Sequence, residues 1–346
     1  MTVYKSTFLS CDFDFDVSGK NYGSARLDYS DDLGVSRVFP IPIATISNGS
    51  GPTILLTAGN HGNEDEGQLI LRRLIHELDP TDICGRIIIL PALNYPAVRS
   101  NRRTSPLDNG NLNRSFPGDP EIGPTSAIAR FVVDQLLPLA DAGIDFHSGG
   151  RAAKYVTTSF LCTCSDPEIY RKSFDLAEAF GAPYLYVVDG TKSKTGFDPV
   201  AHDRQVPFIS NELGGGWIDR EAVQIGYRGI QNVLKFLEIV PESEKKNDDR
   251  KDTIYLDAVN TGDVLYAPYE GIFEARVELG QRVEAGQTAG ALYSLDEVAR
   301  APKILKFAKS GIVCVKAISA RVVHGSRLFV TAESVAAEEI LGLSEV

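Results

Sequence analysis

Short apolar runs alternate with longer segments of helical periodicity through the middle of the chain. The apolar runs have the length and composition of strands buried on both faces, and they fall at residues 53–58, 86–92, 142–146, 157–163, 184–188 and 208–211. Apolar residues recur at helical spacing at residues 65–78, 126–137, 167–180 and 220–237. The alternation predicts an α/β fold in which helices flank both faces of a mostly parallel, mixed sheet.

The two ends of the chain show different patterns. Residues 1–45 hold short alternating patches that predict a few antiparallel strands leading into the sheet. Residues 241–252 are polar and densely charged, and we interpret them as a linker between two domains, 1–240 and 253–346. Beyond this linker, short runs of β-forming residues punctuated by glycine predict a compact all-β domain.

Residues 271–292 resemble half of a biotinyl/lipoyl-type barrel sandwich. A carrier domain of that type would present a modifiable lysine in a short turn between methionines or similar residues. The sequence has one methionine, Met1, and neither Lys303 nor Lys306 has that setting. We therefore expect a barrel-sandwich-like fold without a swinging-arm function.

The composition narrows the range of partners and compartments. The 346-residue chain has a formal net charge of −11 and no basic cluster, so we expect no nucleic-acid partner. It has no apolar stretch of membrane-spanning length, so we expect no membrane partner. The five cysteines are odd in number and scattered, which is typical of core thiols in a reduced, cytoplasmic protein. The oligomeric state is left open, and a homo-oligomer is compatible with the sequence.

Polar side chains follow several predicted strands at the point where each strand ends. His61 and Glu64 follow the first of these strands and precede its helix. His147 follows the strand that ends at residue 146, and Glu212 follows the strand that ends at residue 211. Because the carboxyl ends of the strands in an open α/β sheet form the usual ligand site, we expect these side chains to lie close together.

These residue types suit metal-assisted hydrolysis. His61, Glu64 and His147 would hold one zinc ion per chain and leave one position open for water. Zinc lowers the pKa of bound water and polarises a carbonyl group, and Glu212 would act as the general base. Arginine side chains at Arg103 and Arg114 suit the capture of a substrate carboxylate or the stabilisation of an oxyanion.

Each residue also has a structural interpretation. His61 would then be a turn residue, Glu64 a first-turn carboxylate favoured by the helix dipole, and His147 a satisfied core histidine. Glu212 would pair with an arginine. The three remaining histidines have structural interpretations. We interpret His76 as a surface residue of a helix, His202 as a loop residue that could edge the pocket, and His324 as a residue of the β domain.

Several motifs, in order along the chain, resemble the succinylglutamate desuccinylase/aspartoacylase family, which is related to zinc carboxypeptidases. The motifs lie at residues 59–64, 94–97, 111–118, 145–149 and 212–214. The resemblance implies a zinc-carboxypeptidase-like fold with zinc on His61, Glu64 and His147, and with Glu212 as the catalytic base. It further implies that Asn113 and Arg114 grip the substrate carboxylate and that Arg103 polarises the scissile carbonyl. It also raises Tyr266 and Tyr269 as alternative contributors to the pocket, although packing is the default role for both.

Residues 103–118 and 145–150 are most similar to the branch of that family that deacetylates N-α-acetyl-L-2,4-diaminobutyrate in ectoine breakdown. The resemblance implies zinc-dependent hydrolysis of a small N-acyl amino acid, with a short carboxylate and a free amine as products. One alternative is an aspartoacylase or succinylglutamate desuccinylase-type activity on another N-acyl amino acid. Others are a small-peptide metallocarboxypeptidase and a non-catalytic small-molecule binder.

Overall fold

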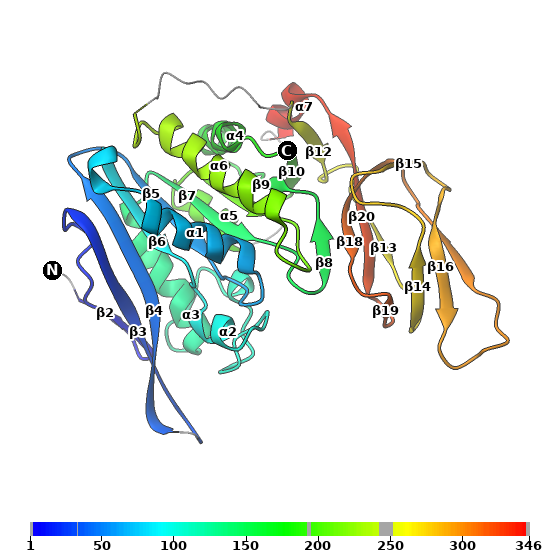
Figure 1. The fold of residues 1–346 in the computed structure, drawn as a ribbon, viewed down its shortest axis with the longest axis horizontal. Coiled ribbons are helices and arrows are strands. Elements are labelled where there is room, and N and C mark those ends of the chain that lie inside the picture. Colours follow the sequence, from blue (N-terminus) through cyan, green and yellow to red (C-terminus); the bar gives the residue numbers. More distant parts are fainter. Residues whose placement is uncertain (1–2, 33, 192–194, 242–251, 344–346) are drawn as a thin grey trace.

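The computed structural model describes residues 3–32, 34–191, 195–241 and 252–343. Its centre is a twisted sheet whose neighbouring strands are joined mostly in parallel (Figure 1). The central strands, in spatial order, are β6 (Gly85–Leu90), β5 (Thr53–Ala58), β7 (Ala142–His147), β11 (Phe208–Glu212), β9 (Thr158–Cys162) and β10 (Tyr184–Val188). All of these neighbours pair in parallel except β11 and β9, which are antiparallel. The predicted mostly parallel, mixed sheet is therefore confirmed.

Antiparallel strands extend the sheet at its N-terminal side, as the alternating patches predict. They are β1 (Tyr4–Lys5), β2 (Leu9–Cys11), β3 (Gly19–Asp31) and β4 (Gly34–Asn48). β4 pairs antiparallel with β6 and so joins this extension to the central strands.

Helices cover both faces because the central strands are apolar on both. Within β5, Ile54 and Leu56 belong to one hydrophobic core and Leu55 belongs to the other. The first core packs against α1 (Asp65–Glu77), α4 (Pro167–Phe180) and α6 (Arg220–Phe236). The second packs against α3 (Pro124–Phe131) and α5 (Phe197–Asp203). The helix expected at 126–137 begins as α3 and continues as a π-helical turn, Val132–Leu136.

The C-terminal part is β-rich, and it extends from the end of the central sheet (Figure 1). β12 (Ile254–Asp257) pairs in parallel with β10 and carries the sheet onward to β20 (Arg327–Val335). The remaining strands are β13 (Asp263–Tyr266), β14 (Gly271–Ala275), β15 (Arg282–Val283), β16 (Thr288–Ser294), β17 (Lys303–Lys306), β18 (Gly311–Ala317) and β19 (Arg321–Val322). The short strand β8 (Ala153–Tyr155), which follows β7 in the chain, pairs with β18.

A final helix, α7 (Ala337–Gly342), was not anticipated from the sequence. It returns to the first core, where Ile340 is fully buried and its carbonyl oxygen accepts a hydrogen bond from the Tyr170 hydroxyl at 2.8 Å. The predicted linker at 241–252 falls largely on residues 242–251, which lie outside the described residues. The division into two domains at this linker stays a prediction.

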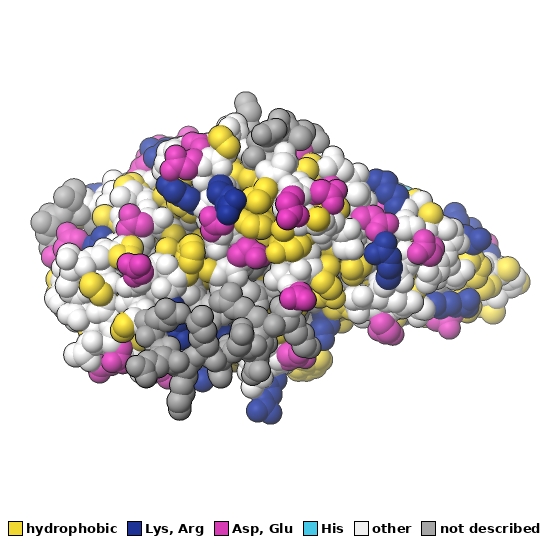
Figure 2. Space-filling model, turned by 90° about the horizontal axis from the view of Figure 1, so that it is seen from above, with side chains coloured by type: hydrophobic (Ala, Val, Ile, Leu, Met, Phe, Trp, Pro, Cys, Tyr) yellow, Lys and Arg dark blue, Asp and Glu magenta, His cyan; other side chains and the backbone are white. Residues whose placement is uncertain are grey.

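Two surface properties bear on the expected partners. None of the helices in the described ranges is long and apolar enough to cross a membrane. On the face shown in Figure 2, basic and acidic side chains are interspersed over the visible surface rather than gathered by sign.

Candidate metal and substrate site

A tight loop after β5 delivers the first two candidate ligands. Glu64 is the N-cap residue of α1, and His61 lies in the turn before it. Glycine is required at position 62, because an added Cβ would lie 2.0 Å from the carbonyl carbon of Ala97. The Gly62 amide donates a hydrogen bond to the Arg102 carbonyl oxygen at 2.9 Å. The loop is therefore fixed against the segment that carries Arg103.

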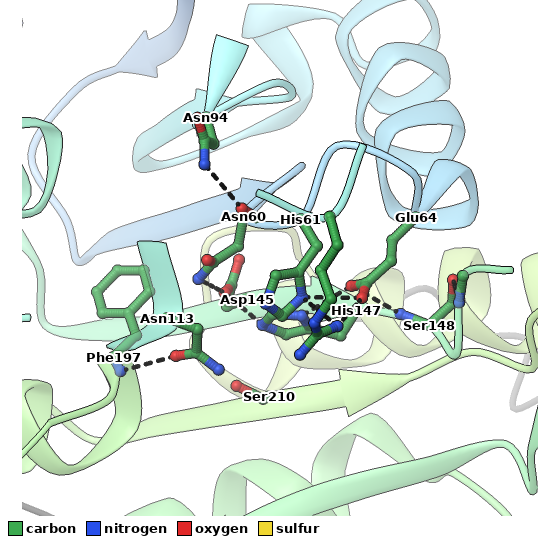
Figure 3. Close-up of polar contacts among 12 residues, drawn as sticks. Asn60, His61, Glu64, Asn94, Asn113, Asp145, His147, Ser148, Phe197 and Ser210 are labelled. Carbon is green, nitrogen blue, oxygen red and sulfur yellow. Dashed lines mark hydrogen bonds and ion pairs between the residues drawn. The ribbon is translucent and has the colours of Figure 1, made fainter. Parts of the chain in front are cut away.

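His61, Glu64 and His147 converge at the carboxyl ends of β5 and β7 (Figure 3). His61 Nδ1 lies 2.8 Å from Glu64 Oε1, and His147 Nδ1 lies 2.9 Å from Glu64 Oε2. One ligand atom from each of the three residues lies within 4.8 Å of the other two. The three side chains are almost fully buried, with relative exposures of 3–5%. Two imidazole nitrogens and a carboxylate form the donor set of a catalytic zinc site.

The far side of each imidazole ring faces an oxygen acceptor. His61 Nε2 lies 3.1 Å from Asn111 Oδ1, and His147 Nε2 lies 2.8 Å from Asp145 Oδ2. Asp145 is itself fixed by the Thr57 hydroxyl at 2.6 Å and by the Asn60 amide at 2.9 Å. Because these oxygens only accept, each ring carries a proton on Nε2 and can turn an Nδ1 lone pair toward a cation. The residues present therefore fit a metal ion.

The electrostatics of the protein alone point to the same conclusion. Burial by itself lowers the pKa of His147, but the flanking carboxylates of Asp145 and Glu64 raise it well above its ordinary value. Burial also opposes ionisation of Glu64, yet His147 and His61 lower the pKa of its carboxyl to about 2. The site thus holds positive charge between its carboxylates, and a divalent cation would replace the His147 Nδ1 proton there.

Glu212 stands beside this group on the neighbouring strand. In the parallel pairing of β11 with β7, Glu212 is aligned with His147, and Ser210 is aligned with Asp145. Burial and then the nearby Glu64 carboxylate raise the pKa of Glu212 to about 8, and its Oε2 has no hydrogen-bond donor among the described residues. A carboxylate with a pKa raised toward neutrality suits a general base that must take and return a proton.

The predicted substrate-binding residues lie around the same site. Arg103 Nη1 lies 3.2 Å from Glu64 Oε1 and 3.3 Å from His61 Nδ1. Asn113 Oδ1 accepts a hydrogen bond from the Phe197 amide at 3.1 Å, which leaves the side-chain NH₂ group as a donor (Figure 3). Arg114 is exposed, and its Nη1 bonds the carbonyl oxygen of Asn113 at 3.0 Å. The structure thus brings all seven candidate residues to one region.

A cleft of about 640 Å³ opens over these side chains. Its walls include Tyr155 of β8 and Arg327 of β20, which sequence reasoning missed. Arg327 Nη2 donates a hydrogen bond to the Tyr155 hydroxyl at 3.0 Å, so the C-terminal part closes one side of the cleft. Nothing in the local sequence distinguishes Arg327, because strand pairing between distant segments, β8 with β18 and β10 with β12, brings this part to the cleft.

The tyrosines considered from the sequence have other positions. Tyr266 is 54% exposed, and the hydroxyl of Tyr269 donates a hydrogen bond to the Leu292 carbonyl oxygen at 2.9 Å. Neither is among the residues that line the cleft. Tyr266 is therefore a surface residue, and Tyr269 is a packing residue of the C-terminal part.

The loop predicted around His202 is wrong. Residues Phe197–Asp203 form α5, and His202 is buried with its Nε2 3.0 Å from the Phe208 carbonyl oxygen. A proline at position 199 had favoured the loop, but proline is tolerated in the first turn of a helix. His76 is exposed, as expected, and His324 lies in the β-rich C-terminal part, between β19 and β20.

The comparisons with known proteins agree with this geometry. The family model of the succinylglutamate desuccinylase/aspartoacylase catalytic domain matches residues 50–237. The N-alpha-acetyl-L-2,4-diaminobutyric acid deacetylase of Halomonas elongata is 36% identical over 94% of this chain and 95% of that protein.

Solved structures of similar chains cover nearly the whole molecule. A succinylglutamate desuccinylase/aspartoacylase from Rhodobacter sphaeroides has a TM-score of 0.88 at 34% identity, over 95% of this chain and 100% of that one. The product-bound ectoine utilization protein EutE of Ruegeria pomeroyi has a TM-score of 0.89 at 31% identity, over the same shares of the two chains. The chain belongs to the succinylglutamate desuccinylase/aspartoacylase family.

Proposed function

We propose that this protein is a zinc-dependent amidohydrolase that removes a short acyl group from a small N-acyl amino acid. The observation that carries the proposal is the placement of Glu212 beside the His61, Glu64 and His147 group in one cleft. The 36% identity to a deacetylase of N-α-acetyl-L-2,4-diaminobutyrate makes that compound the first candidate substrate, with ectoine degradation as its setting.

The side chains divide the reaction between them. When bound by His61, Glu64 and His147, zinc would lower the pKa of a water molecule and polarise the amide carbonyl. Glu212 takes a proton from the attacking water as the new C–O bond forms. It then delivers that proton to the departing nitrogen as the C–N bond breaks. Water and amide thus give one carboxylate and one amine.

Cationic and amide donors position the substrate. Arg103 lines the cleft, and in this proposal it hydrogen-bonds the carbonyl oxygen as negative charge develops on it. The Asn113 amide and the Arg114 guanidinium, which also line the cleft, bind the α-carboxylate of the amino acid. Arg114 binds it as a charge-assisted pair at the exposed rim of the cleft.

The closed wall of the cleft favours small substrates over peptides. Tyr155 and Arg327 close one side of the cleft, and a volume of about 640 Å³ suits a molecule of a few residues at most. A small-peptide carboxypeptidase is the alternative function, because it would use the same ligands and the same base.

A substrate panel tests the proposal. The zinc-loaded protein is incubated with N-acetyl, N-succinyl and dipeptide compounds, and the free amine is measured with and without a chelator. Chelator-sensitive release from an N-acyl amino acid is expected. Faster cleavage of dipeptides would favour the carboxypeptidase, and tight binding without any release would favour a binding protein. Metal analysis of the protein as purified tests zinc against cobalt and manganese, which N and O ligands also hold.

A further inference from the structure

A buried carboxylate in the cleft has no role in the reaction as described above. Asp198, in the first turn of α5, lines the cleft and is 7% exposed. Its Oδ2 accepts a hydrogen bond from the Ser210 hydroxyl at 2.9 Å. Its Oδ1 is shielded from solvent and finds no hydrogen-bond donor among the described residues. One of the two oxygens of the Asp198 carboxylate therefore has no hydrogen-bond donor among the described residues.

The arginines of the cleft make their contacts elsewhere. Arg103 bonds Glu64, Arg114 bonds the carbonyl oxygen of its neighbour, and Arg327 bonds Tyr155. Burial and then repulsion from Asp145 raise the pKa of Asp198 to about 6, despite the hydrogen bond from Ser210. At neutral pH the group is thus largely an anion. The His147 ring lowers its pKa, but among the described residues no arginine of the cleft bonds it. A buried charge of this kind is costly unless it is paired.

The position of Asp198 corresponds to the amino-acid side of the substrate. The amide of its neighbour Phe197 bonds the side chain of Asn113, which is proposed to hold the α-carboxylate. Its partner Ser210 lies two residues before Glu212 on β11, and both line the cleft. Successive residues on one face of a strand are about 6.6 Å apart. Figure 3 shows Asn113, Phe197 and Ser210 together beside the histidines.

We propose that Asp198 determines substrate specificity by pairing with an ammonium group on the side chain of the amino acid. The preferred substrates are then N-α-acyl derivatives of short diamino acids, with the α-amine acylated and the side-chain amine free. This inference rests on the proposed amidohydrolase function and adds the residue that binds the side-chain ammonium. A bound ammonium would form a charge-assisted hydrogen bond with the Asp198 carboxylate, and a rotation of the side chain would bring the shielded Oδ1 to the cleft.

The test compares two substrates that differ only in the side-chain ammonium. They are N-α-acetyl-2,4-diaminobutyrate and N-acetyl-2-aminobutyrate, assayed with the wild type, Asp198→Asn and Asp203→Asn. Asp203 is an exposed carboxylate at the other end of α5 and serves as the matched control. We expect Asp198→Asn to lower kcat/KM for the diamino substrate by roughly 10- to 100-fold. Its kcat/KM for the neutral substrate should stay the same, and the control should change neither.

An equal loss on both substrates would overturn the inference, because it would make Asp198 a structural support of β11. A wild type without preference for the diamino substrate would also overturn it. If Asp198→Asn fails to fold, Ser210→Ala takes its place. Removal of the hydrogen bond to Asp198 should then give a smaller loss, confined to the diamino substrate.

Calorimetric binding of the free products separates this inference from the proposed function. The wild type should bind 2,4-diaminobutyrate more tightly than 2-aminobutyrate, and Asp198→Asn should lose this difference. Equal binding of the two by the wild type would contradict the role of Asp198. Failure to hydrolyse any N-acyl amino acid would remove the proposed function, whereas hydrolysis without preference for the cation would remove only the role of Asp198.

Discussion

Substitution of Asp145 by asparagine should weaken metal binding without touching a ligand. Asp145 is fully buried, accepts hydrogen bonds from the Thr57 hydroxyl and the Asn60 amide, and lies 2.8 Å from His147 Nε2 through its Oδ2. An asparagine removes the negative charge beside His147, and its NH₂ group would face the Asn60 and His147 nitrogens wherever it took the place of Oδ2. The ring of His147 would lose either its orientation or the charge that holds it.

The magnitude follows from the burial of the site. A buried donor left unsatisfied costs about 1–3 kcal/mol. Loss of the partner that orients a metal-binding histidine typically costs roughly 10- to 100-fold in metal affinity, which corresponds to about 1.4–2.7 kcal/mol. The two estimates agree, so we expect Asp145→Asn to raise the Kd for zinc by roughly 10- to 100-fold.

Competition with a chromophoric chelator measures this change directly. Thr57→Val is the matched control, because it removes one hydrogen bond to Asp145 and keeps the carboxylate beside His147. Its effect on the Kd should be smaller than that of Asp145→Asn. Wild-type zinc affinity in a folded Asp145→Asn protein would refute the role of Asp145 in orienting the ligand.

Three further predictions concern the substrate, the β-rich wall and the base. Arg114→Ala should raise KM more than it lowers kcat if Arg114 binds the carboxylate equally well in the ground state and in the transition state. Steady-state kinetics showing a large kcat loss at constant KM would contradict this. Arg327→Ala should lower kcat/KM by roughly 10-fold, because Arg327 lines the cleft. The amount of bound zinc should stay constant. Unchanged kinetics would exclude a contribution of Arg327 to the reaction. The pKa of Glu212 is about 8 in the fold against 4.5 for the ordinary side chain, so the folded state binds more protons between these values. The stability contribution of Glu212 in the metal-free protein therefore falls as pH rises through this window, and Glu212→Gln should flatten the profile of Tm against pH. Parallel profiles for the two proteins would count against the raised pKa.

The central sheet was predictable because its strands are buried on both faces. Runs such as 53–58 and 86–92 are mostly apolar along their whole length, which is the pattern of strands buried on both faces. The short helix α7 and strand β12 were not predictable, because their places depend on packing and pairing with residues far away in the chain. The same holds for α5, where a local proline suggested a loop.

The candidate site was predictable to the extent that its residues follow strands. His147 and Glu212 come directly after apolar runs, and His61 and Glu64 lie in the loop that follows residues 53–58. Parallel pairing aligns His147 with Glu212. Asp145 lies inside a strand, and its role depends on contacts across to β5 and the loop after it. Asp198 and Arg327 reach the cleft only through tertiary structure, so no spacing in the sequence marks them.

The most direct measurement is the release of free amine from N-α-acetyl-2,4-diaminobutyrate by zinc-loaded wild type and Glu212→Gln. Both proteins should bind zinc, because Glu212 is not one of the grouped ligands. The wild type should release amine in a chelator-sensitive reaction, and Glu212→Gln should lose most of that turnover. Equal turnover by the two proteins, or release that a chelator leaves unchanged, would contradict the account.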